Sequence, residues 1–212
     1  MNADTRIRRV LKPLVFALAL TPLALLAWKA THGGLGAHPQ EFVNRFFGDW
    51  ALRFLLIALS VTPVRGLTGW NALARFRRMF GLFAFFYACL HVTSYVAVDQ
   101  FFDWAAIGKD IVKRNYITVG MATFLVLIPL AATSTDGMLR RLGGPRWKKL
   151  HRLVYVAGVA GVFHFYMMVK ADVREPLIYA AILAVLLGYR VVQRLKRAAK
   201  RPRKSEGRAP AV

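Results

Sequence analysis

Three histidines lie in or at the edge of apolar stretches of this chain: His91, His151 and His164. An ionisable side chain inside a bilayer is costly, and it usually faces the interior of a helical bundle with a defined partner. Two neutral imidazoles facing each other across a bundle are the axial pair that a b-type haem needs. The three residues therefore predict a bound metal or cofactor. The other two histidines, His32 and His38, lie in a polar loop and need no role.

The elements that must position these histidines are membrane-spanning helices. Of the 212 residues, 57% are hydrophobic, yet the formal net charge is +21, so apolar and charged residues must be segregated along the chain. Six apolar stretches approach the roughly 17–25 residues that cross a bilayer core. They are Pro13–Trp28, Trp50–Val64, Met79–Val98, Tyr116–Thr133, Leu153–Val169 and Pro176–Val192. The sequence predicts an all-α, polytopic membrane protein with a bundle of six transmembrane helices.

Basic residues predict the orientation of this bundle, because short cytoplasmic loops collect Lys and Arg. With the N-terminus inside, the inner segments hold 23 of the 31 basic residues, so both termini are predicted to be cytoplasmic. Residues 1–12 form a basic N-terminal segment, 13–195 the six-helix haem-binding domain and 196–212 a basic tail expected to be disordered. The asymmetry explains the charge without nucleic acid, and the tail is expected to contact anionic lipid headgroups of the bilayer.

The depths of the histidines predict two levels of sites. The third and fifth stretches both run from inside to outside, so His91 lies in the outer half, and His151 lies at the inner edge. His164 is about 19.5 Å further out than His151, at 1.5 Å per helical residue. His91 and His164 can therefore meet at the outer level. The rings of His151 and His164 do not share a helix face, which disfavours one zinc ion bound by all three histidines.

Arg77 is expected opposite His151 at the inner level. It precedes His91 by fourteen residues, which returns to within about 40° of the same helix face. A guanidinium is a poor iron ligand because it stays protonated, but it suits a haem propionate or a flavin phosphate. The inner site is then either a haem with an unusual or missing fourth ligand, or a site for another anionic cofactor.

The rest of the chain offers no second catalytic unit. No glycine-rich strand–turn–helix pattern for a dinucleotide occurs, and the lone Cys89 is expected to be a packing residue. The acidic residues cluster in loops and at the ends of the apolar stretches. Two outer connections, GGLGAHPQEFVNRFFGDW and DQFFDWAAIGKDIVKRN, each suggest a short amphipathic helix at the outer surface.

Two segments carry a resemblance to a known family: RRMFGLFAFFYACLH and RWKKLHRLVYVAGVAGVFHF. They resemble the ferric-reductase-like transmembrane domain shared by ferric reductases and NADPH oxidases. Within that superfamily, FGDWALRFLLIALSVTPVR, the total length and the lack of a flavin and NADPH domain are similar to the haem-binding membrane subunit of the bacterial periplasmic methionine sulfoxide reductase system. The resemblance covers the chain from Lys12 to about Leu195.

The resemblance implies a set of roles. Larger superfamily members hold two stacked haems, and the matching positions here are His91 and His164 for the outer haem, with His151 and Arg77 at the inner level. Arg77 departs from the histidine pattern, which puts the inner bis-histidine haem in doubt; Arg77, with Arg78 beside it, is assigned to cofactor binding. The resemblance implies one or two haems b, with FMN also associated. It implies electron transfer from quinol across the inner membrane to a periplasmic, molybdopterin-containing reductase that repairs oxidised methionine and carries the catalytic site.

Two alternatives remain open from the residues. The first is a ferric-reductase-like haem protein fed by a separate cytosolic flavin reductase, which could dock on the basic inner loops. The second is a transporter in which the histidines line a proton or metal path. Proton-coupled carriers usually pair histidine with intramembrane carboxylates, and the placement of the acidic residues argues against that class.

Overall fold

The long apolar segments fold into helices because lipid offers no hydrogen bonds to the backbone, and a helix satisfies its own amides. The computed structural model describes residues 5, 7–169 and 171–199. The α-helices are α2 (Lys12–Thr31), α3 (Pro39–Thr68), α4 (Arg77–Ser94), α5 (Trp104–Lys113), α6 (Asn115–Ala132), α7 (Asp136–Leu142), α8 (Gly144–Leu150), α9 (Leu153–Met168) and α10 (Arg174–Ala199). Short π- or 3₁₀-helical segments are η1 (Ile7–Leu11), η2 (Asn71–Arg75) and η3 (Tyr95–Asp99).

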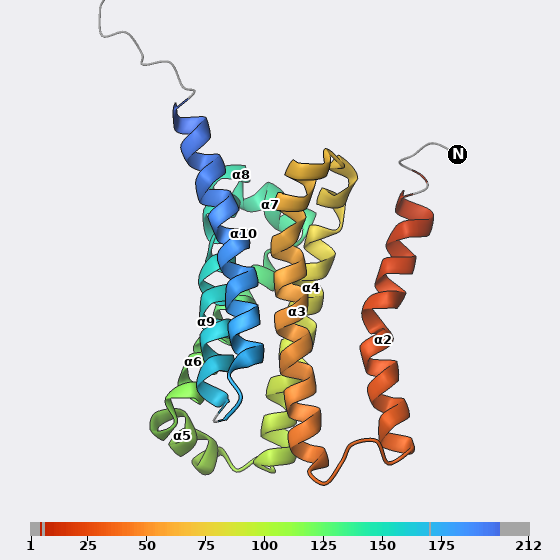
Figure 1. Ribbon diagram of the computed structural model, residues 1–212, viewed down its shortest axis with the longest axis vertical. Helices are drawn as coiled ribbons and strands as arrows, with labels where there is room; N and C mark the ends of the chain where they lie inside the picture. The colour runs from red at the N-terminus through yellow and green to blue at the C-terminus, as the bar shows by residue number, and fades with distance from the viewer. Residues whose placement is uncertain (1–4, 6, 170, 200–212) are drawn as a thin grey trace, which may run out of the picture.

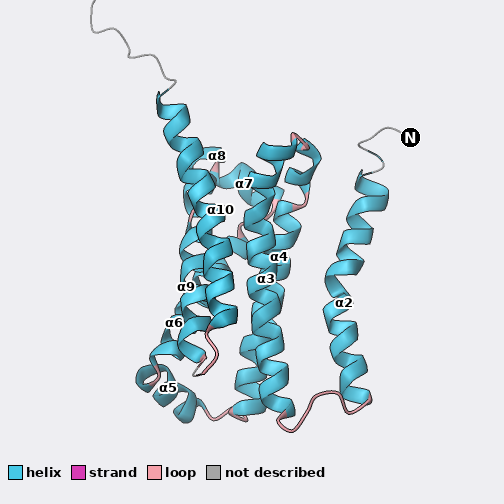
Figure 2. Ribbon diagram, viewed as in Figure 1, coloured by secondary structure: helices cyan, strands magenta, loops and turns pink. Residues whose placement is uncertain are grey.

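The long helices run up and down side by side (Figure 1). The start of α2 and the end of α10 lie at one end of the bundle, together with α7 and α8, whereas α5 lies at the opposite end. Figure 2 shows that the connections between helices are short loops. We call the end with α7 and α8 the inner end and the end with α5 the outer end, after the orientation that the charges predict.

Five of the helices are long and apolar enough to cross a membrane: α2 with the segment before it, α3, α4 with η3, α6 and α10. The remaining long element, α9, has 16 residues and lies against α6 and α10. The chain is therefore a multi-pass, all-helical membrane protein. The count of six spans stays a prediction, as does the orientation.

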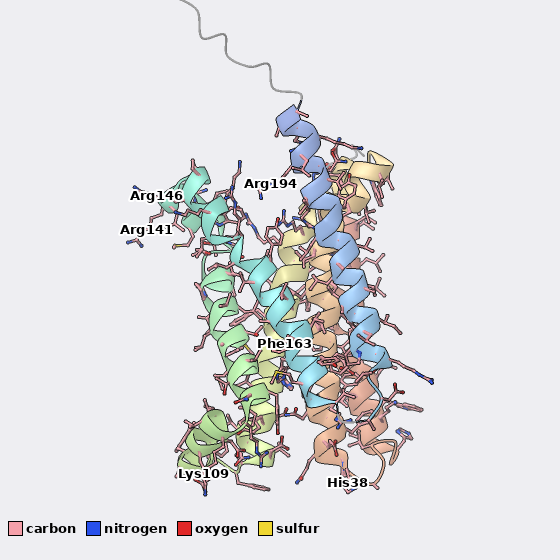
Figure 3. All side chains as sticks on the ribbon, turned by 60° about the vertical axis from the view of Figure 1, so that its left-hand side comes forward. His38, Lys109, Arg141, Arg146, Phe163 and Arg194 are labelled. Atoms are coloured by element: carbon pink, nitrogen blue, oxygen red, sulfur yellow. The ribbon has the colours of Figure 1, made fainter. Side chains whose placement is uncertain are left out.

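Labelled basic side chains mark both ends of the bundle. Arg141, Arg146 and Arg194 project at the inner end, whereas Lys109 and His38 mark the outer end (Figure 3). The helix α10 continues to Ala199, past the predicted end of the helical domain at 195, and the remainder of the predicted basic tail lies outside the described residues.

One prediction about the outer connections is wrong. The segment around Phe42 and Phe46 is not a separate surface helix, because α3 begins at Pro39 and continues without a break to Gly69, whose φ of 71° ends it. Asp49 consequently lies about three turns inside a long helix rather than at its end. The second amphipathic segment does form a short helix, α5, in which Asp103 accepts a hydrogen bond from the Ala106 amide.

Packing around α3 holds the bundle together. Tyr87 of α4 is fully buried, stacks on Phe54 of α3 and donates a hydrogen bond to the Ala19 carbonyl, which ties α2 to the bundle. On the other side of α3, Leu59 packs with α9 and Leu183 of α10. This arrangement leaves the inward faces of α3, α4, α6 and α9 around a common interior.

Candidate functional site

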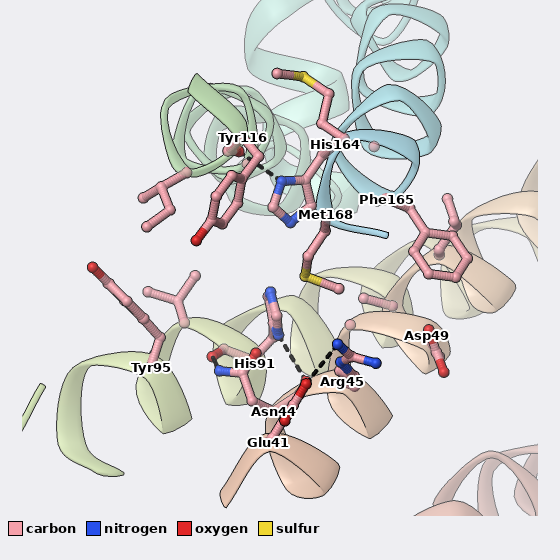
Figure 4. Close-up of a pocket in the computed structure, with 18 of the residues that line it drawn as sticks. Glu41, Asn44, Arg45, Asp49, His91, Tyr95, Tyr116, His164, Phe165 and Met168 are labelled. Atoms are coloured by element: carbon pink, nitrogen blue, oxygen red, sulfur yellow. Dashed lines mark hydrogen bonds and ion pairs between the residues drawn. The ribbon is translucent and has the colours of Figure 1, made fainter. Parts of the chain in front are cut away.

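The centre of the site is a pair of imidazoles from two helices that are far apart in the sequence. His91 of α4 and His164 of α9 have ring centroids 6.2 Å apart, with the ring planes inclined at 68°. Figure 4 shows the two rings approaching each other across the interior, with one nitrogen of each ring directed toward the other ring. The structure therefore brings together the two histidines that the sequence places at one depth.

Backbone carbonyls determine which ring nitrogens are free. The Nδ1 atom of His91 lies 2.9 Å from the Asn44 carbonyl oxygen, and the Nδ1 atom of His164 lies 2.7 Å from the Tyr116 carbonyl oxygen. A carbonyl only accepts, so each Nδ1 carries the proton and donates it. Both Nε2 atoms are then left as lone-pair donors, which is the arrangement typical of metal-bound histidines.

The spacing of the rings fits one metal ion between them. A bond from an imidazole nitrogen to a metal is about 2 Å long, and the ring centre lies about 1 Å beyond the nitrogen, so two rings on opposite sides of one ion have centroids about 6 Å apart. The observed 6.2 Å agrees with this value. The pair thus has the geometry and the protonation states for axial ligation.

Two glycines allow the helices to approach the rings. A Cβ atom on Gly48 of α3 would lie 3.2 Å from Cε1 of His91, and one on Gly120 of α6 would lie 2.7 Å from Cε1 of His164. Real Cβ atoms essentially never come closer than 3.0 Å to such an atom. Gly120 is therefore required for the observed position of the His164 ring. A side chain at position 48 would crowd the His91 ring less severely.

A cavity of about 1360 Å³ surrounds the imidazole pair and extends to the outer end. Its deeper wall is apolar and includes Leu52, Leu55 and Leu127. Its outer part carries the guanidinium groups of Arg45 and Arg114. A flat, largely apolar cofactor with anionic substituents fits such a lining, because apolar side chains cover its faces and arginines pair with carboxylates.

A hydrogen-bond cluster at the outer end supports the carbonyl that holds His164. Asp110 of α5 accepts from Tyr95 Oη and Gln100 Nε2, both at 3.2 Å, and pairs with Arg114 Nε at 3.2 Å. Arg114 in turn donates to Tyr116 Oη at 3.3 Å. The cluster joins α5 and the segment after α4 to the first turn of α6, where the Tyr116 carbonyl accepts from His164.

The inner level is arranged differently. Thr133 donates its hydroxyl proton to the Pro129 carbonyl at 2.6 Å, so it accepts from Nε2 of His151 at 3.0 Å. Trp147 stacks on the same imidazole, with ring centroids 3.8 Å apart. Nε2 of His151 is thus engaged, and Nδ1 is left as its free nitrogen. In the described part of the chain, the inner level therefore lacks the two free Nε2 atoms that the outer level has.

Cations surround His151. Burial lowers the pKa of its imidazole below the ordinary value, and the charges of Arg77 and Arg78 lower that pKa further. Arg77 is the first residue of α4, the helix that also carries His91. Arg78 pairs with Asp136 of α7 at 2.6 Å. The roles assigned to His151, Arg77 and Arg78 stay predictions.

The sequence did not identify several residues that shape the site. Asn44 and Tyr116 act through backbone carbonyls, which no residue type reveals. Gly120 was detectable only as a glycine within an apolar stretch, a feature that often marks close packing, and Gly48 lay in a predicted outer connection.

Comparison with known proteins gives two findings. Residues 47–162 match the family described as ferric reductase like transmembrane component, a segment that contains His91 and His151 and ends just before His164. The chain is also similar to proteins named protein-methionine-sulfoxide reductase heme-binding subunit MsrQ. It is 56% identical to that of Rhodospirillum rubrum over 92% of this chain and 91% of the relative. It is 52% identical to that of Herminiimonas arsenicoxydans, over 86% and 84%, and 48% identical to that of Caulobacter vibrioides, over 88% and 89%.

Proposed function

The chain belongs to the ferric-reductase-like transmembrane family and, within it, to the haem-binding subunits of protein-methionine-sulfoxide reductase, and on this basis we propose that it is a haem b electron-transfer subunit of the bacterial inner membrane. In this proposal it takes electrons from the quinol pool and delivers them to a periplasmic, molybdopterin-containing reductase. That partner reduces methionine sulfoxide and carries the catalytic site. The observation that supports the proposal most strongly is the pair of free Nε2 atoms on His91 and His164.

The residues of the outer level have separate tasks in this proposal. His91 and His164 are the axial ligands, and the carbonyls of Asn44 and Tyr116 fix their orientation through Nδ1. Arg45 and Arg114 are the proposed partners of the propionates, and this pairing requires Arg45 to share or leave its ion pair with Glu41, and Arg114 its ion pair with Asp110. When bound, the haem supplies reversible one-electron chemistry, whose potential is set by axial ligands, hydrogen bonding and burial. The apolar wall keeps water from the ligating nitrogens.

The inner level is proposed as a second cofactor position. Arg77, with Arg78 beside it, suits a haem propionate or the phosphate of FMN, and His151 is the proposed ligand if a second haem binds there. Ligation by Nε2 of His151 requires its hydrogen bond to Thr133 to break. The ratio of haem to protein distinguishes a second haem from FMN.

A cytosolic flavin reductase is the second candidate donor, and the basic inner end favours it. Arg140 and Arg141 of α7, with Arg146, Lys148 and Lys149 of α8, form a concentrated positive surface there. Arg141 and Arg146 project from this end (Figure 3). An acidic protein or a flavin phosphate is attracted to such a surface.

Optical spectroscopy of the purified protein tests the proposal. We expect a low-spin b-type change on reduction with dithionite, and the same change on addition of a quinol. A haem-to-protein ratio near one indicates that only the outer level holds haem, and a ratio near two indicates both. Protein that contains no haem after expression with ample haem contradicts the proposal. Reduction by NADH with a flavin reductase, and none by quinol, supports the second donor.

Asp110→Ala tests the cluster that supports His164. We expect the haem to be retained, because neither ligand changes, but the low-spin EPR g values and the midpoint potential to shift, because hydrogen bonding to Nδ1 tunes a metal-bound imidazole. Asp172→Ala is the control, since Asp172 also lines the cavity but its side chain is 72% exposed. Identical g values and potentials in Asp110→Ala and the unmodified protein contradict this role of Asp110.

A further inference from the structure

We propose that the outer cavity binds the headgroup of a membrane hydroquinone, with the carboxylate of Asp49 accepting a hydrogen bond from a hydroquinone hydroxyl. The inference rests on the proposed function, in which quinol is the electron donor, and it adds where the donor binds. It also explains why an acidic residue lies within a helix that is otherwise suited to cross a membrane.

Asp49 lies at the depth of the imidazole pair. It follows Gly48 directly, and Gly48 is the residue whose Cα faces the His91 ring. Asp49 lines the same cavity as His91 and His164, and Figure 4 shows it on α3, on the far side of Arg45 from the two imidazoles. An ionisable group at such a depth is costly, so it is by default associated with function. A ligand at Asp49 therefore shares the cavity of the proposed haem ligands.

The carboxylate of Asp49 lacks a hydrogen-bond donor in the described part of the chain. Its ion pair is with Arg53, one helical turn away, at 3.9 Å. Arg53 instead donates to Tyr179 Oη of α10 at 2.7 Å, and its guanidinium lies over the Trp50 ring. The side chain of Asp49 is only 27% exposed. A mostly buried carboxylate without a donor is unfavourable unless a ligand or water supplies one.

The charges near Asp49 favour a neutral ligand there. Among the described residues, five acidic side chains and two arginines line the cavity: Glu41, Asp49, Asp99, Asp172 and Glu175, with Arg45 and Arg114. Arg45 is already paired with Glu41 at 2.5 Å. An anionic group placed beside Asp49 and Glu175, rather than beside the arginines that suit the propionates, is repelled by these carboxylates. A hydroquinone is uncharged and dissolves in the bilayer.

Hydrogen-bond chemistry makes the site selective for the reduced form. An ionised carboxylate only accepts, a hydroquinone hydroxyl donates, and a quinone carbonyl only accepts. Asp49 thus favours hydroquinone over quinone, which is the preference that an electron-accepting subunit needs. An amide at the same position both donates and accepts, so it removes this preference while preserving the shape.

Equilibrium binding of decylubiquinol to the dithionite-reduced haem protein tests the proposal, since no electron transfer to a reduced haem can occur. We expect Asp49→Asn to weaken binding of the hydroquinone about tenfold, the difference that loss of a charge-assisted hydrogen bond produces. Binding of decylubiquinone to the oxidised protein is expected not to weaken, because the amide can donate to a quinone carbonyl. Asp49→Glu is expected to restore the preference for hydroquinone. Unchanged haem content in both variants shows that they fold.

Asp172→Asn is the matched control, because it removes the same charge from the cavity lining at a side chain that is 72% exposed. We expect it to bind decylubiquinol like the unmodified protein. Equal binding by Asp49→Asn and the unmodified protein, or equal weakening in the two Asn variants, overturns the inference. If the unmodified haem protein is not reduced by decylubiquinol at all, the proposed donor itself is wrong, a result distinct from failure at Asp49.

Discussion

Replacing His91 or His164 by alanine removes the low-spin b-type haem spectrum of the purified protein. Each imidazole supplies one of the two free Nε2 atoms, and its Nδ1 is held by a backbone carbonyl, so no neighbouring imidazole takes its place. A haem left with one protein ligand becomes high-spin or dissociates. Optical and EPR spectra of the two variants, with the haem-to-protein ratio, measure the effect.

His38→Ala is the control for this experiment. His38 also lines the cavity, but at its outer rim, just before α3 begins. We expect its spectrum to match that of the unmodified protein. His151→Ala reports on the inner level: it lowers the haem ratio only if a second haem binds there. Low-spin spectra that persist in both His91→Ala and His164→Ala would show that other residues hold the haem.

The sequence was sufficient to predict that His91 and His164 lie close together. Counting residues from the inner edge of each apolar stretch placed His91 and His164 at one depth, and in a helical bundle residues of equal depth can meet. The same counting placed Arg77 near His151, where burial and, after it, the charge of Arg77 lower the pKa of the imidazole. Depth is predictable because a bilayer fixes the length and the direction of each helix.

Two features were less predictable from the sequence: the direction in which each side chain points around its helix axis, and the structure of the chain outside the apolar stretches. The prediction that the rings of His151 and His164 do not share a helix face assumed one continuous helix. His151 instead caps the end of α8, and α9 begins only at Leu153, so the angle between the two rings does not follow from one helical repeat. Hydrophobicity alone also ended the second stretch at Trp50, although α3 starts at Pro39. For that reason Asp49 was counted among residues at helix ends, and its place inside the cavity was missed. The argument against a transporter from the placement of acidic residues is correspondingly weaker.

The second large expected effect is on haem binding, when a glycine beside an imidazole ring is replaced by alanine. In Gly120→Ala, the new methyl group would lie 2.7 Å from Cε1 and 2.9 Å from Nδ1 of His164. The ring must then move, although its Nδ1 is hydrogen-bonded to Tyr116 at 2.7 Å and its Nε2 is the proposed iron ligand. We expect ferric EPR spectra with a high-spin component and a reduced haem content.

The graded series Gly120→Ala, Gly48→Ala and Gly81→Ala separates this effect from any general effect of alanine. At Gly48 the contact with His91 would be 3.2 Å, so a smaller spectral change is expected, and at Gly81 of α4 nothing lies within 4 Å, so none is expected. Alanine in a helix interior is more favourable than glycine by about 0.5–1 kcal/mol, which opposes unfolding. Haem loss in Gly120→Ala therefore reports displacement of the imidazole rather than a weakened helix. Equal, unchanged spectra across the series would mean that the His164 ring is not confined between α6 and the metal.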